Sequence, residues 1–118
     1  NLIKGAIKET KKSKFILSRT IIVPGVFEIP FVIVKKINKF DAFVALGCVI
    51  KGKTSHFELI TQATTNAIMN LSIKYKKPIG NGIISCLNKK QAFERSDNIF
   101  KNKGSESMKA VMSVLKLI

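Results

Sequence analysis

A serine and a glutamate three residues apart mark the segment of this sequence with the most obvious chemistry. Ser55 and Glu58 have the spacing of a helix capping box, which predicts a helix beginning at this point. Residues 52–54, Gly-Lys-Thr, lead backbone N–H groups into the helix N-terminus, where free donors and the helix dipole bind anions. His56, the only histidine, then lies in the first turn, where an imidazole can transfer protons near pH 7. The pattern indicates an anion site beside a proton-transfer group, with an ordinary capped helix and a surface histidine as the plainer interpretation.

Three other charged residues lie where they could hold a substrate. Glu28 follows a Pro-Gly turn, Arg95 is one of two arginines, and Lys103 directly precedes a predicted helix. A carboxylate accepts hydrogen bonds from hydroxyl groups, and a guanidinium holds phosphate through paired N–H donors. Each residue also has a simpler interpretation, because acids often occupy the first turn of a helix and most basic side chains are solvated.

The motifs of several common enzyme classes are missing from the sequence. It contains no G-x-x-x-x-G-K-(S/T), no G-x-G-x-x-G and no G-x-S-x-G pattern. A single histidine argues against a histidine-based metal site. Cys48 and Cys86 lie in apolar runs without C-x-x-C spacing, which predicts two buried thiols in preference to a disulfide or a metal site.

The spacing of apolar residues predicts the elements that position these groups. Strands alternate with helices, which favours the α/β class, a three-layer sandwich of a parallel sheet flanked by helices on both faces. Ligands of such sheets bind beyond the carboxyl ends of the strands. The first helix has no strand before it, so we expect a strand ahead of Asn1 or a sheet edge completed by another chain. The predicted helices span residues 1–10, 26–39, 55–75, 88–95 and 104–118, and the predicted strands span 15–23, 41–50 and 79–87.

Length, composition and charge limit the class of protein further. A chain of 118 residues with 46% hydrophobic residues predicts one domain with a packed core, and its apolar runs are too short to span a membrane. No signal peptide is visible, so we expect a cytoplasmic protein. The net charge of +14 is typical of proteins that bind nucleic acid. However, nineteen of the 21 basic residues are lysines spread along the chain, and no aromatic stripe offers base stacking, so we do not expect nucleic acid as the primary partner.

Three segments carry patterns that occur together in one enzyme family. Residues 23–30 read V-P-G-V-F-E-I-P, and residues 46–58 read L-G-C-V-I-K-G-K-T-S-H-F-E. Residues 78–85 read P-I-G-N-G-I-I-S and are followed by Q-A-F-E-R at 91–95 and N-K-G at 102–104. In order and spacing these segments resemble the 6,7-dimethyl-8-ribityllumazine synthase family, also called the riboflavin synthase beta-chain family. The resemblance covers essentially the whole chain and implies a flavodoxin-like fold.

The resemblance implies a transferase of riboflavin biosynthesis that works without a metal or organic cofactor. The family condenses 5-amino-6-(D-ribitylamino)uracil with 3,4-dihydroxy-2-butanone 4-phosphate, and phosphate and water are lost. By the same resemblance His56 is the catalytic residue that moves protons. The residues expected to bind the butanone phosphate are Gly52, Lys53, Thr54, Arg95 and Lys103. The residues expected to bind the ribitylaminouracil are Val26, Phe27, Glu28, Val49, Ile50, Lys51, Gly80 and Asn81.

The resemblance also implies an active site shared between adjacent subunits of a homopentamer, with icosahedral assembly of pentamers in some members. Residues 79–82, Arg95 and Lys103 would then come from the neighbour of the subunit that supplies His56. Riboflavin synthase is an implied partner, and no membrane partner is expected. Lys53, Asn81 and residues 96–101 depart from the commoner family pattern, and the family's first strand, which ends in an aromatic residue, has no counterpart in residues 1–118. The alternative functions are a non-catalytic or related riboflavin-pathway homologue that binds ribityl heterocycles, and a basic nucleic-acid-binding α/β domain.

Overall fold

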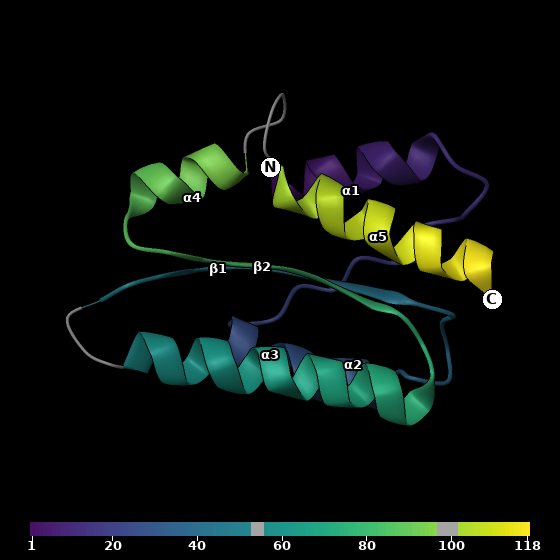
Figure 1. Cartoon of the computed structure of the whole chain (residues 1–118), viewed down its shortest axis with the longest axis horizontal. Coiled ribbons are helices and arrows are strands. Elements are labelled where there is room, and N and C mark those ends of the chain that lie inside the picture. Colours follow the sequence, from purple (N-terminus) through teal and green to yellow (C-terminus); the bar gives the residue numbers. More distant parts are fainter. Residues whose placement is uncertain (53–55, 97–101) are drawn as a thin grey trace.

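Two parallel strands form the middle layer of the molecule, which the computed structural model describes over residues 1–52, 56–96 and 102–118 (Figure 1). Strand β1 (Phe43–Ile50) pairs with β2 (Ile79–Cys86) in a register that places Phe43 opposite Ile79 and Ile50 opposite Cys86. Helix α3 (His56–Tyr75) connects the two strands, as a parallel pair requires. The predictions of these three elements are confirmed, with bounds shifted by one or two residues at the strand ends.

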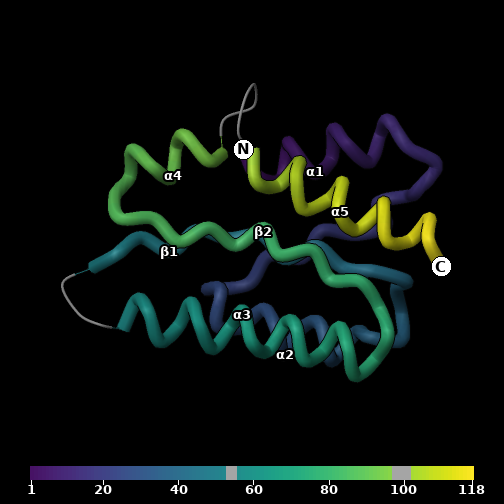
Figure 2. The backbone as a smooth tube through the Cα atoms, viewed as in Figure 1, coloured from purple at the N-terminus to yellow at the C-terminus, as the bar shows by residue number. Residues whose placement is uncertain are grey.

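Helices cover both faces of the sheet. The 3-10 helix η1 (Val26–Glu28), α2 (Ile29–Lys35) and α3 lie on one face. On the other face lie α1 (Leu2–Lys11), α4 (Lys89–Arg95) and α5 (Lys103–Leu117) (Figures 1 and 2). The α/β class with helices on both faces of a parallel sheet is therefore confirmed. No helix in the described part of the chain has both the length and the apolar composition needed to cross a bilayer.

Each face of the sheet has its own apolar core. Side chains along β1 alternate between the two cores, with Ala45 in the first and Val44 and Leu46 against the second. Burial of a large aliphatic side chain stabilises a fold by about 2 kcal/mol, so both cores hold helices to the sheet. The buried members of the first core are Ile29, Ile33, Ile37, Ala45 and Ile68, and those of the second are Ala6, Met108 and Met112.

Two glycines let α5 lie directly on β2. A Cβ atom on Gly80 would lie 2.7 Å from the carbonyl oxygen of Ser107, and a Cβ atom on Gly82 would lie 2.7 Å from the Ser107 hydroxyl oxygen. Any side chain at Gly80 would press on the backbone of α5 and force the helix away from the sheet. The glycines of β2 therefore fix the height of α5, and with it the position of Lys103, above the sheet.

The helix predicted over residues 26–39 is shorter than expected. It begins as η1, continues as α2 and ends at Lys35, beyond which the chain forms a turn. The ammonium group of Lys77 donates hydrogen bonds to the carbonyl oxygens of Ile37, at 2.6 Å, and Phe40, at 2.9 Å. These bonds satisfy two carbonyl groups of the turn that follows α2, so the turn is stabilised without further helical pairing.

The prediction of a strand over residues 15–23 is wrong for the structure described. The segment has neither helix nor strand, although it is rich in β-branched residues. Strand preference acts only where a neighbouring strand accepts the hydrogen bonds, and here a groove separates the segment from β1. As a result Ile16 and Ile22 remain 89% and 78% exposed.

The prediction of two buried thiols is right for Cys86 and wrong for Cys48. Cys86 is 1% exposed, whereas Cys48 lies on the open side of β1 and is exposed. Both are free thiols. Partial burial, and secondly the nearby Cys86 thiol, raise the pKa of Cys48, so this thiol stays protonated and unreactive near neutral pH.

Glu9 ties α1 to α5. Its buried carboxylate accepts a hydrogen bond from the Ser105 hydroxyl at 2.9 Å and lies 3.6 Å from the Lys12 ammonium and 3.9 Å from the Lys109 ammonium. Burial alone would favour the neutral carboxyl group. The hydrogen bond from Ser105 and the charges of Lys109 and Lys12 outweigh that effect and lower the pKa of Glu9.

We expect Glu9→Gln to reduce the free energy of unfolding by about 1 kcal/mol at neutral pH. Since the folded-state pKa lies below the ordinary value of 4.5, the ionised carboxylate stabilises the fold above that value. This contribution is lost as the pH falls through the folded-state pKa, so the variant and the parent should converge in acid. Urea denaturation at neutral and acid pH measures the difference. Glu106→Gln, at an exposed ion pair, is the matched control and should reduce the free energy of unfolding by less than half as much. A Glu9→Gln loss of stability that stays the same in acid would contradict the role assigned to the ionised Glu9 carboxylate.

Candidate active site

The start of η1 rests on the carboxyl-terminal half of β1. A Cβ atom on Gly47 would lie 2.5 Å from Val26 Cγ1, so only a glycine lets η1 approach the strand this closely. The Glu28 amide donates to the carbonyl oxygen of Gly25 at 3.2 Å, which closes the turn that follows Pro24. The predicted substrate-binding residues of η1 are thereby held beside the end of β1.

Side chains at this end of the sheet are open to solvent. Phe27 is 61% exposed and Ile50 is 39% exposed, while Glu28 and Lys51 are also exposed and Val49 is half-buried. Exposed aromatic and aliphatic side chains next to a carboxylate suit a ligand that has both an apolar ring and hydroxyl groups.

The first turn of α3 begins close beyond β1. The Lys51 amide donates to the Cys86 carbonyl oxygen at 2.8 Å, which extends the ladder one residue past the strand. Gly52 follows, and the position of a Cβ there lies in open space, so its backbone is accessible to a ligand. His56 is the first residue of α3 and is exposed. Lys53, Thr54 and Ser55 lie outside the described residues, so the phosphate loop and the capping box stay predictions.

Predicted site residues from η1, the end of β1 and the start of α3 form a group whose elements pack together, since η1 contacts both β1 and α3. We call it the α3-side cluster, and its members come from η1, the end of β1 and the start of α3, elements that the first core holds together. It consists of Val26, Phe27, Glu28, Val49, Lys51, Gly52 and His56. The side chain of Ile50 belongs to the alternate set of β1 with Val44 and Leu46, so only its backbone borders this cluster.

Arg95 is held over the end of β2 on the other face. Asn88 caps helix α4, which ends at Arg95, because the Asn88 side-chain oxygen accepts from the Gln91 amide at 3.0 Å. One guanidinium nitrogen donates to the Ser85 carbonyl oxygen at 2.8 Å, and the side chain is exposed. A guanidinium carries five N–H donors, so this bond orients the group without using its capacity to bind an anion.

Lys103 is the first residue of α5. Its ammonium lies 3.5 Å from the Glu106 carboxylate. Gly80 lies buried beneath the same helix, so a ligand could contact only its backbone. Asn81 is exposed, and its side-chain oxygen accepts from the Ile83 amide at 3.1 Å. We call Arg95 and Lys103 the α5-side pair.

The sheet separates the two groups within one chain. Helix α3 and η1 lie on one face, and α4 and α5 lie on the opposite face (Figures 1 and 2). One chain therefore carries η1 and the start of α3 on one face of the sheet, and Arg95 and Lys103 on the other. Among the described residues, no three His, Cys, Asp or Glu side chains gather as a metal site would need.

Asn102 positions the α5-side pair, a role that the sequence analysis did not assign. Its side-chain oxygen accepts from the Ser105 amide at 2.9 Å, which caps α5. Its side-chain nitrogen donates to the carbonyl oxygens of Asn1, at 2.8 Å, and Ser96, at 3.1 Å. The residue thus fixes the start of α1, the end of α4 and the start of α5. Its place two residues before the helix predicted over 104–118 was the available signal.

Comparison with known proteins confirms the resemblance. A family model described as 6,7-dimethyl-8-ribityllumazine synthase matches residues 1–118. The chain belongs to this family. Among lumazine synthases, the protein of Wigglesworthia glossinidia brevipalpis is 41% identical over 123 residues, which cover 100% of this chain and 80% of that protein. The lumazine synthase of Bartonella tribocorum is 40% identical over 120 residues, covering 98% of this chain and 78% of that protein. That of Campylobacter curvus is 42% identical over 99 residues, covering 82% and 64%.

Proposed function

We propose that this chain condenses 5-amino-6-(D-ribitylamino)uracil with 3,4-dihydroxy-2-butanone 4-phosphate to form 6,7-dimethyl-8-ribityllumazine. Membership of the lumazine synthase family makes it a transferase of riboflavin biosynthesis. The observation that supports the proposal is the packing of η1 against α3 and β1, because these elements carry two motifs from separate parts of the sequence.

The α3-side cluster would bind the ribitylaminouracil. Glu28 would accept hydrogen bonds from the ribityl hydroxyl groups, and the exposed ring of Phe27 would pack against the chain. Residues 49–51, which continue the strand, would line the pyrimidine through side chains and backbone groups. Val26 holds η1 in place through its contact at Gly47. Gly80 and Asn81 would complete this half of the site from a neighbouring copy.

The butanone phosphate would bind between the two groups. Gly52, Lys53 and Thr54 would offer the N-terminus of α3, and the guanidinium of Arg95 would pair with the dianion. Lys103 would add positive charge, although its ion pair with Glu106 weakens its field. His56 would then move protons during imine formation and phosphate elimination.

We infer that copies of the chain assemble so that the α5-side pair of one completes the α3-side cluster of the next. Support comes from large apolar side chains left exposed on α2 and α3, a pattern typical of subunit interfaces. We propose the homopentamer that the family resemblance implies, alone or as the unit of an icosahedral shell, and sedimentation velocity distinguishes these. The exposed side chains are Phe31 at 68%, Leu59 at 66%, Met69 at 60% and Ile73 at 69%.

We further infer a cytoplasmic reaction whose product passes to riboflavin synthase. Support for the compartment comes from Cys48 and Cys86, which are free thiols of the kind that persist in a reducing environment. Small-molecule substrates follow from the family, and neither nucleic acid nor a membrane is needed for the reaction.

The activity is tested by supplying purified protein with both substrates and following the fluorescence of the lumazine. Product formation above the slow uncatalysed reaction supports the proposal, and its absence overturns it. Titration calorimetry with the product separates the alternative, since a homologue that only binds ribityl heterocycles would show binding without turnover.

We expect His56→Ala to lower kcat by about tenfold, because holding two reactants together contributes more than moving protons in this condensation. KM for both substrates should change little. Steady-state kinetics of the purified variant measures both constants. His56→Gln keeps a polar side chain without the acid–base function and should match the alanine variant. A loss in kcat/KM for the butanone phosphate greater than that caused by Arg95→Ala would contradict the proposed order of effects.

A further inference from the structure

Four lysines lie on one side of helix α1. Lys4, Lys8, Lys11 and Lys12 are exposed, and together with Ile7 they surround a shallow hollow of about 460 Å³. Residues three or four positions apart lie on the same side of a helix, so the ammonium groups of these lysines meet the same region of solvent. The sequence spreads its lysines along the whole chain, whereas the fold gathers four of them on one surface. We call these four residues the α1 lysine face.

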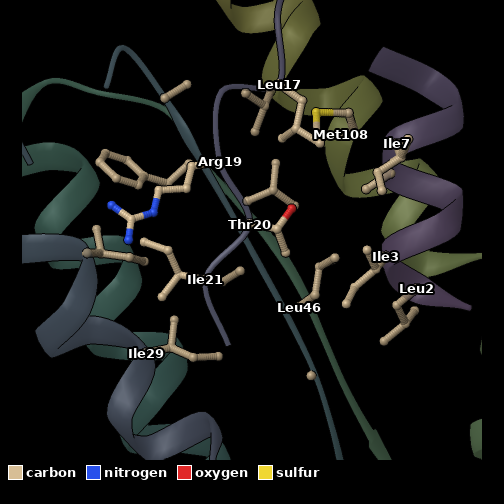
Figure 3. Close-up of a pocket in the computed structure, with 18 of the residues that line it drawn as sticks. Leu2, Ile3, Ile7, Leu17, Arg19, Thr20, Ile21, Ile29, Leu46 and Met108 are labelled. Atoms are coloured by element: carbon tan, nitrogen blue, oxygen red, sulfur yellow. The ribbon is translucent and has the colours of Figure 1, made fainter. Parts of the chain in front are cut away.

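The other side of α1 is packed inside the molecule, which turns the α1 lysine face outward. Helix α1 packs against α5 and β1, and Ala6 lies in the second core. Figure 3 shows the side chains of Ile3 and Ile7 extending from α1 into the space between this helix and Leu46 of β1. The apolar side of the helix therefore holds the fold together, and the lysine side is available to a partner.

Little negative charge offsets the α1 lysine face. Glu9 is the single acidic residue of α1, and its carboxylate is shared between Lys12, at 3.6 Å, and Lys109 of α5, at 3.9 Å. Among the described residues, the other three lysines of the face have no ion-pair partner. Like charges three or four residues apart destabilise a helix, and an anion that binds across several of them relieves this repulsion. The face is therefore better suited to binding a polyanion than to stabilising the fold.

We propose that the α1 lysine face binds the phosphate backbone of a nucleic-acid duplex, as a secondary partner and away from the active site. From Lys4 to Lys12 the helix rises about 12 Å, at about 1.5 Å per residue. Over that length a duplex presents about seven phosphate charges, which is enough for each lysine to meet one. Lysine contacts of this kind hold the backbone without reading the base sequence.

The composition of α1 favours a duplex over a single strand. The helix contains neither an arginine nor an aromatic residue. Arginine is the usual residue for reading base edges, and aromatic rings are the usual platform for unstacked bases, so this surface offers contacts to phosphates only. A duplex has the higher density of phosphate charge along its axis, so it should bind more tightly than a single strand.

A membrane surface fits the α1 lysine face less well. Helices that lie on a bilayer bury an apolar side among the lipids, but the apolar side of α1 is occupied by α5 and β1. The face also lies across the sheet from α2 and α3, whose exposed apolar side chains we assign to contacts between copies (Figure 1). Contacts through α2 and α3 leave α1 uncovered, so several copies of an assembly can contact one duplex.

Fluorescence anisotropy of a labelled DNA duplex of about thirty base pairs, at several salt concentrations, tests the proposal. The parent protein should bind at about 50 mM salt and lose at least about 100-fold in affinity by about 200 mM, as four phosphate contacts predict. The triple variant Lys4→Gln, Lys8→Gln and Lys11→Gln should bind at least about 100-fold more weakly at the lower salt. The slope of log Kd against log salt should fall by about 3 for each chain in contact.

A matched control removes the same charge from the opposite layer. Lys35, Lys39 and Lys74 are exposed and lie in or next to α2 and α3. Their triple glutamine variant should bind the duplex within about threefold of the parent, because charges away from the contact are screened by salt. An arginine version of the α1 lysine face should bind as the parent does, since it keeps the charge. Equal weakening by the two glutamine variants would show that binding follows net charge alone and would overturn the proposal.

Three further results would overturn the proposal. They are no binding of the duplex at about 50 mM salt, tighter binding of a single strand with the same number of phosphates, and binding only to vesicles of phosphatidylserine and phosphatidylcholine. Glutamine has the helix propensity of lysine, so circular dichroism of the triple variant should match the parent. If the triple variant does not fold, Lys8→Gln alone should reduce the slope by about 1, and an unchanged slope would overturn the proposal. Duplex binding is measured without substrates, so its result is independent of the lumazine assay.

Discussion

Arg95→Ala should lower kcat/KM for the butanone phosphate by about 100- to 1000-fold, the loss expected when a guanidinium that holds a dianion is removed. The loss should appear mainly in KM for this substrate, because the phosphate is gripped before and during the reaction. The kinetics for the ribitylaminouracil should change little. The hydrogen bond from Arg95 to the Ser85 carbonyl oxygen fixes the guanidinium over the end of β2, so the variant removes a positioned group and not a mobile one.

Arg95→Lys and Arg19→Ala provide the controls for this prediction. Lysine keeps the charge at position 95 without the planar pair of donors, so its kinetics should lie between those of the parent and the alanine variant. Arg19, the other arginine, lies on the wall of the groove, and its replacement should leave kcat/KM unchanged. Because Arg95 is exposed, its replacement should also leave the unfolding free energy within about 0.5 kcal/mol of the parent. Unchanged use of the butanone phosphate by Arg95→Ala would place this residue outside the active site.

Strands buried by their neighbours were predictable from the sequence, and the segment without a neighbour was not. Residues 41–50 and 79–87 are apolar runs, and each forms a strand because the other accepts its hydrogen bonds. Residues 15–23 are also rich in apolar and β-branched residues, yet they form no strand. Composition measures how well side chains fit a pleated surface, whereas a strand exists only when a second chain segment lies alongside.

Helix ends depended on tertiary contacts that a local pattern does not contain. The end of α2 at Lys35 is stabilised by Lys77, which lies about forty residues away in the sequence and donates to the carbonyl oxygens beyond the helix. By contrast, α5 could be placed closely because its signals are local. Asn102 caps it, and Met108, Val111 and Met112 repeat at helical spacing on its buried face.

The candidate site was predictable as a set of residues but not as an arrangement. Motif spacing placed Glu28 and His56 at the ends of elements, and the fold packs those elements, η1 and α3, against each other. Nothing in the local pattern shows that α4 and α3 lie on opposite faces, which follows from the path of the chain after β2. The anchoring of Arg95 on a backbone carbonyl of β2 likewise depends on how α4 packs and left no local signal.

Mixing two damaged variants should restore activity if the site is shared between copies. Arg95→Ala retains an intact α3-side cluster, and His56→Ala retains an intact α5-side pair. The two variants are unfolded together in denaturant at equal amounts and refolded into mixed rings. If contacts between copies form at random, about one site in four should combine an intact α3-side cluster with an intact α5-side pair. Assayed with the butanone phosphate well below its KM, the mixture should then show about a quarter of the parent activity, whereas separately refolded samples pooled afterwards should show about 5%, the mean of their individual activities.

This result depends on the face that each element occupies, and no property of a single subunit can reproduce it. If His56 and Arg95 of one chain served the same site, every site in a mixed ring would carry one defect, and co-refolding would give no more activity than pooling. A mixture of Arg95→Ala with Lys103→Ala is the matched control, because both changes damage the α5-side pair and no intact half results from combining them. Recovery in that control would show that activity returns by refolding alone. Recovery confined to the His56 and Arg95 mixture would require the sheet of one chain to present His56 on one face and Arg95 on the other to two different neighbours.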